Sequence, residues 1–76
     1  MQLRPIGSNQ TEILQNNGTV VFFSYQTPVA ALLPRGEGYV RTEDFFSVTT
    51  SKHINKWLDG IDARKIPQAE LESLIG

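Results

Sequence analysis

The residues best suited to chemistry or binding lie in one ten-residue run, from Thr49 to Leu58, which holds the only histidine and the only tryptophan of the chain. The spacing of the run predicts a helix whose polar side carries Lys52, His53, Asn55 and Lys56. The first turn of a helix offers free backbone N–H groups, and these side chains can bind a phosphate or another polar group of a partner. The alternative is that they contact only water while the other side anchors the helix.

Catalysis at this run has little support from the sequence. A nucleophilic site needs a serine or threonine beside a histidine that a carboxylate orients, and His53 is the only available base. Ser51 is two residues away and therefore on a different side of the helix. We expect His53 to be a solvent-exposed helix histidine, and we predict no catalytic residue, no metal site and no cofactor, because one histidine without cysteine is a poor zinc ligand set.

The same helix face makes nucleic-acid binding the leading alternative function, with Arg41 as a further phosphate contact. The formal net charge of −1, from seven basic and eight acidic residues, argues against nucleic-acid binding. A nucleic-acid-binding domain is usually basic. The charge balance also gives no reason to expect binding to an anionic membrane.

A protein interface is most often anchored by tyrosine, tryptophan and arginine. Trp57 falls on the apolar stripe of the predicted helix and is expected in the core. The predicted partner-binding residues are therefore Tyr25, Tyr39, Arg41, Lys52, His53, Asn55 and Lys56.

Length and composition restrict what can position these residues. The 76 residues are enough for a single domain over 1–76, with a thin margin of stability and no cysteine to reinforce it. A free sheet edge could be stabilised by a second copy, so a homo-oligomer is one expectation. No stretch has the length or apolarity of a signal peptide or a membrane span, which leads us to expect a cytoplasmic protein without membrane contact.

The first two thirds of the chain read as strands. Asn16-Asn17-Gly18 predicts a two-residue hairpin turn between arms at 11–16 and 19–25, and the second arm is apolar on both faces, as in a central strand. Pro28 bounds a further strand at 29–33, a loop at 34–38 leads into a strand at 39–42, and the segments 3–7 and 45–48 are weaker strand candidates.

The last third reads as two helices. Ile54, Trp57, Leu58 and Ile61 follow helical spacing, with Thr50 or Ser51 as the N-cap and Gly60 as the stop. A second helix should begin at Pro67 and run through Leu71 to Ile75, after a loop at 62–65. The predicted fold is α+β: a small antiparallel sheet of about four or five strands, followed by two short C-terminal helices packed on it.

Two blocks of the sequence, residues 22–31 (FFSYQTPVAA) and 49–58 (TTSKHINKWL), resemble a family of small uncharacterised bacteriophage and prophage proteins, and residues 38–42 fit as well. The resemblance implies a phage-encoded accessory protein in the bacterial cytoplasm that binds and modulates a host or phage protein without catalysis. A nucleic-acid-binding accessory protein that uses helix 51–59 and a minor structural protein of the phage particle are the two alternatives.

Overall fold

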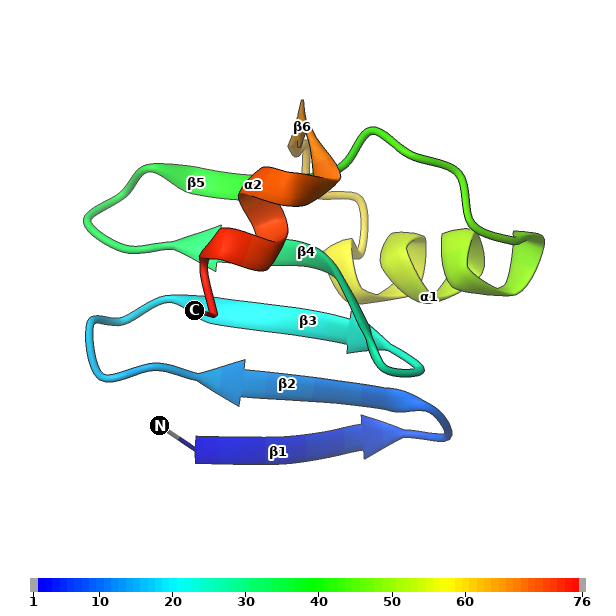
Figure 1. The fold of residues 1–76 in the computed structure, drawn as a ribbon, viewed down its shortest axis with the longest axis horizontal. Coiled ribbons are helices and arrows are strands. Elements are labelled where there is room, and N and C mark those ends of the chain that lie inside the picture. Colours follow the sequence, from blue (N-terminus) through cyan, green and yellow to red (C-terminus); the bar gives the residue numbers. More distant parts are fainter. Residues whose placement is uncertain (1, 76) are drawn as a thin grey trace.

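The computed structural model describes residues 2–75, which form one six-stranded sheet with a helix on each face (Figure 1). The strands lie side by side in the order of the sequence, and every neighbouring pair is antiparallel except β5 and β6, which are parallel. The fold is therefore α+β, with a small sheet and C-terminal helices, as predicted. The strands are β1 (Gln2–Gly7), β2 (Gln10–Leu14), β3 (Val20–Ser24), β4 (Thr27–Leu33), β5 (Gly38–Thr42) and β6 (Arg64–Ile66); the helices are α1 (Val48–Leu58) and α2 (Gln68–Ser73).

The β2–β3 hairpin is present, but its turn differs from the predicted two-residue turn. Leu14 pairs with Val20, and the amide of Gln15 donates to the carbonyl of Thr19 at 2.9 Å, so the loop consists of residues 16–18. Gly18 takes a φ of 94°, and the side chain of Asn17 accepts a hydrogen bond from the amide of Thr19. A three-residue loop that ends in a left-handed glycine is the next favoured hairpin connection, which explains the difference.

β3 lies inside the sheet, as its apolar faces predicted, and it divides the core into two layers. Val21 and Phe22 are both fully buried, and as neighbours in a strand they point to opposite faces. α1 covers the face of Phe22 and α2 the face of Val21. One layer contains Phe22, Val29, Ala30, Ile54 and Leu58, and the other contains Val21, Ala31, Val40, Ile66 and Leu71.

The boundaries of α1 depart from the prediction. Its N-cap is Ser47, whose hydroxyl accepts from the amide of Thr50 at 3.0 Å, so the helix begins earlier than a cap at Thr50 or Ser51 would allow. It ends at Leu58, and Asp59 takes the left-handed cap conformation, which leaves Ile61 outside the helix and 45% exposed. The predicted strand at 45–48 is absent: Phe45 is 73% exposed, and Val48 is already helical.

Two further strand predictions need correction. Residues 62–65 were expected to be a loop, but Arg64–Ile66 forms β6. β6 pairs with β5, and α1 lies between these two strands in the sequence. A local pattern of three residues does not predict such a long-range pairing. β4 begins at Thr27, before Pro28, and the register shift beside Phe23 accommodates a residue that has no amide hydrogen. In α2, Pro67 is the N-cap and not the first helical residue.

Candidate partner-binding surface

The four predicted polar side chains of α1 point in three different directions. Positions in an α-helix are about 100° apart, so two residues separated by two positions lie about 160° apart around the axis. Lys52 and Lys56 are exposed on the outer side, away from the buried Ile54. His53 and Asn55 lie on the two opposite flanks, where each contacts a different strand. These four side chains therefore do not form one continuous face.

On one flank, His53 is tied to the sheet and is not the exposed histidine that we expected. Its Nδ1 is 2.8 Å from the hydroxyl of Ser24, the last residue of β3, and that hydroxyl is 3.1 Å from Oγ1 of Thr50. No local pattern predicts this pair, because the two partners are 29 positions apart in the sequence. Ser24 is only 2% exposed, so its hydroxyl cannot reach a substrate. The cluster can join α1 to β3, but it cannot act as an accessible nucleophile and base.

On the other flank, Asn55 lies beside β5. Nη1 of Arg41 donates to Oδ1 of Asn55 at 3.4 Å, a long hydrogen bond. Lys65 of β6 is the register partner of Arg41, so both side chains lie on the α1 face of the sheet. Arg41 and Asn55 were predicted as partner-binding residues and are brought together, whereas Lys65 was missed because β6 was read as a loop.

Trp57 packs into the α1 layer, and Tyr39 packs with it. The indole ring is stacked on Phe22 with a centroid distance of 5.0 Å and an interplanar angle of 12°, and the ring of Tyr39 meets it nearly edge-on at 5.7 Å. Tyr39 is therefore half-buried and supports Trp57, and it is not the exposed interface anchor that the sequence suggested.

The indole N–H of Trp57 donates to Oε2 of Glu12 at 2.5 Å, and Oε1 of Glu12 accepts two hydrogen bonds from Arg4 on β1. Glu12 is 9% exposed, and this arrangement satisfies both oxygens of its carboxylate. No local pattern predicts the contact between Glu12 and Trp57, because the two residues are 45 positions apart in the sequence. The contact fixes α1 over the first strands of the sheet.

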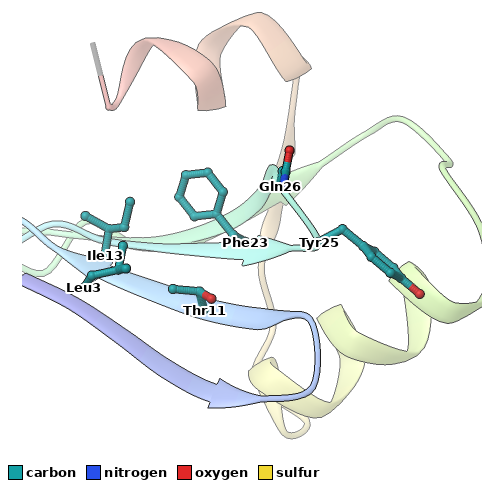
Figure 2. Close-up of a pocket in the computed structure, with 6 residues that line it drawn as sticks. All are labelled: Leu3, Thr11, Ile13, Phe23, Tyr25 and Gln26. Carbon is teal, nitrogen blue, oxygen red and sulfur yellow. The ribbon is translucent and has the colours of Figure 1, made fainter.

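The other face of the sheet carries an apolar groove, shown in Figure 2, that α2 leaves uncovered. α2 contacts β4 and β5 and packs with Val21 of β3 in one core layer, so on this face the outer part of the sheet, over β1 and β2, lies beyond it. One row of paired residues runs across this face from Val40 through Val21 and Ile13 to Leu3, and exposure rises from 0% at Val40 to 66% at Leu3. The groove has a volume of about 270 Å³ and is lined by Leu3, Thr11, Ile13, Phe23, Tyr25 and Gln26.

Tyr25 stands at the rim of this groove in an unusual backbone conformation. Its φ of 59° lies in the left-handed region, which bulky side chains seldom adopt. The residue is 51% exposed, and its ring turns from the groove toward α1, where its centroid is 5.9 Å from that of His53 (Figure 2). Tyr25 thus lies between the groove and one flank of α1.

The apolar groove residues Leu3, Ile13 and Phe23 were missed as candidates. Leu3, Ile13 and Phe23 alternate with polar or opposite-facing residues along strands, which signals a core face as readily as a binding face. Only the length of α2 and its position over β4 and β5 decide which part of the face stays open. The exposure of these groove residues therefore depends on the assembled fold and not on a local sequence pattern.

Other kinds of site are not seen in the part of the chain that the structure describes. Among residues 2–75, no three side chains of histidine, cysteine, aspartate or glutamate come together as metal ligands. No helix within these residues has both the length and the apolar character needed to cross a membrane.

Comparison with known proteins gives one finding at the level of the family. No curated protein and no solved structure matches the chain significantly. A family model does match, over residues 1–73, which is nearly the whole sequence. The chain therefore belongs to DUF8033, a family of unknown function.

Proposed function

We propose that this protein is a non-catalytic protein-binding module, an accessory protein of phage type that binds a host or phage protein in the bacterial cytoplasm. The observation that carries the proposal is the apolar groove over β1, β2 and β3, which residues 2–75 leave uncovered. A small domain has little apolar surface to spare, and a contiguous exposed apolar patch is typical of a protein interaction site.

The composition of the groove fits a protein partner. Its lining combines aliphatic and aromatic side chains, such as Ile13 and Phe23, with the hydroxyl and amide groups of Thr11 and Gln26. Protein interfaces combine an apolar centre with a polar rim in this way. Tyr25, at the rim, is of the residue type that most often anchors an interface.

The strained backbone at Tyr25 gives independent support. Asparagine or glycine would occupy its left-handed position at lower conformational free energy. Residues held in such conformations cluster at functional sites, where the side chain serves a purpose other than stability. An exposed tyrosine at this position therefore favours a binding role.

The test is an affinity pull-down with the full chain as bait, from infected and uninfected bacterial cells, read by mass spectrometry. Leu3→Asp places a charge at the edge of the groove, on a side chain that is already 66% exposed, so the fold should be kept. Val48→Asp is the matched control, since Val48 is 63% exposed and lies outside the groove. We expect a protein that wild type and Val48→Asp retain and Leu3→Asp loses.

Three results would overturn the proposal. They are capture of no protein above background, equal capture by the wild type and Leu3→Asp, and retention on mixed DNA and RNA in 50 mM salt that charge reversal at Lys52 and Lys56 abolishes. The last result would establish the nucleic-acid alternative. Recovery of the chain as a component of purified virions would favour the structural alternative.

A further inference from the structure

Two basic side chains, Arg41 and Lys65, lie directly beside each other on the α1 face of the sheet. The parallel register of β5 and β6 pairs them, and no carboxylate forms an ion pair with either of them within residues 2–75, where Arg4 and Glu12 make the one ion pair. Like charges on directly opposed residues destabilise a sheet. The pair therefore concentrates positive charge without an ion-pair partner among the described residues.

The guanidinium group of Arg41 is also short of hydrogen-bond acceptors. Its Nε is buried and has no partner in the described structure, and its Nη1 makes only the 3.4 Å contact with the neutral side chain of Asn55. An unpaired buried donor is unfavourable by about 1–3 kcal/mol. An anion that binds the outer N–H groups of Arg41 would give this guanidinium a charged acceptor, which none of the described residues supplies.

We propose that Arg41, Lys65 and Asn55 form a carboxylate-binding site that receives an acidic segment of the protein partner. This inference rests on the proposed function and names the chemistry of the partner. Arg41 supplies a planar set of donors suited to a carboxylate, and Lys65 supplies a second charge beside it. Asn55 accepts from Arg41 through Oδ1, which leaves its amide N–H groups to donate to the same ligand.

The size of the positive region favours an acidic protein segment over nucleic acid. Glu43 and Asp44 directly follow β5 and are exposed, and the exposed Asp62 precedes β6. A nucleic-acid strand presents a continuous row of phosphates and is held by many basic contacts along its path. Here acidic residues lie close in the sequence to both Arg41 and Lys65, which limits the basic site to these two side chains. A site of this size matches one or two carboxylates.

The experiment is an NMR titration of the ¹⁵N-labelled full chain with hexaglutamate as the probe, at low ionic strength. The Nε–Hε signal of Arg41 and the backbone amides of Arg41, Asn55 and Lys65 should shift together. Lys65→Gln should weaken the apparent affinity about tenfold, since it removes one of the two adjacent charges. Arg35→Gln is the matched control, because it removes the same charge from an exposed loop position at the far end of β4.

Equal weakening by Lys65→Gln and Arg35→Gln would show that only net charge matters and would overturn the proposal, as would the absence of shifts at Arg41. Tighter binding of a thymidine oligonucleotide of matched charge would overturn it in favour of nucleic acid. The pull-down separates this inference from the proposed function. Capture that is lost with Leu3→Asp but unchanged with Lys65→Gln would reject the carboxylate site and keep the protein-binding role.

Discussion

Among single residues, Glu12 connects α1 with the first two strands, because its carboxylate accepts from both Trp57 and Arg4. In Glu12→Gln, one oxygen is replaced by an NH2 group, which must face a donor from one of these partners. We expect the free energy of unfolding to fall by about 1–3 kcal/mol, the usual effect of an unsatisfied buried polar group. Urea denaturation followed by the fluorescence of Trp57, the only tryptophan, measures the change.

Arg4→Gln is the matched variant on the other side of the same ion pair. The side chain of Arg4 is 55% exposed, and water can replace its guanidinium in the opening of about 290 Å³ beside Glu12 and Trp57. Its loss should therefore lower stability by less than about 1 kcal/mol. A larger effect for Arg4→Gln than for Glu12→Gln would contradict this account of the pair.

Tyr25 leads to a prediction in which stability and binding change in opposite directions. Asparagine tolerates the left-handed conformation, so Tyr25→Asn should raise the free energy of unfolding by up to about 1 kcal/mol, while it removes the exposed aromatic ring. Gln26→Asn, the neighbouring position of the same turn without a positive φ, should give no such gain. Chemical denaturation measures the stability of both variants, and the pull-down measures binding. Destabilisation by Tyr25→Asn would mean that the contact of the ring with His53 outweighs the strain.

At the scale of elements, the start of α1 gives the most direct test. Ser47→Ala removes the hydroxyl that accepts from the amide of Thr50, so we expect a loss of about 1 kcal/mol in the free energy of unfolding. Ser51→Ala, at a cap position that the sequence suggested, should change stability by no more than about 0.5 kcal/mol. Thermal melting followed by circular dichroism compares the two variants. A larger loss for Ser51→Ala would place the functional cap where the sequence pattern put it.

The elements that the sequence predicted are those specified by local signals. The β2–β3 hairpin has a turn sequence with flanking apolar runs, β3 is apolar on both faces, and α1 has a regular apolar stripe. β6 was missed because three residues with two charges form a strand only when α1 returns the chain to β5. The same limit applies to the candidate site, since the partners of His53, Trp57 and Arg41 come from distant strands or helices.

For the molecule as a whole, the two edges of the sheet determine whether copies associate. β1 is exposed along its full length but contains Pro5, which has no amide hydrogen and is tolerated where that group would face solvent. β6 is short and carries the exposed Arg64 and Lys65. Proline and basic residues on edge strands oppose pairing with another chain. We therefore expect a monomer, which differs from the homo-oligomer that small size and a free sheet edge suggested.

Pro5→Val tests this explanation, because it restores the missing donor at the β1 edge and adds a residue that favours strands. Gln2→Val is its control, since it adds the same side chain to β1 without adding a donor. Light scattering coupled to size-exclusion chromatography should show wild type and Gln2→Val as monomers at micromolar concentrations, with melting temperatures that do not depend on concentration. Pro5→Val should form larger species as its concentration rises. If the wild type is already a dimer with a concentration-dependent melting temperature, the edges do not protect the chain, and a second copy becomes the first candidate to cover the groove beside β1.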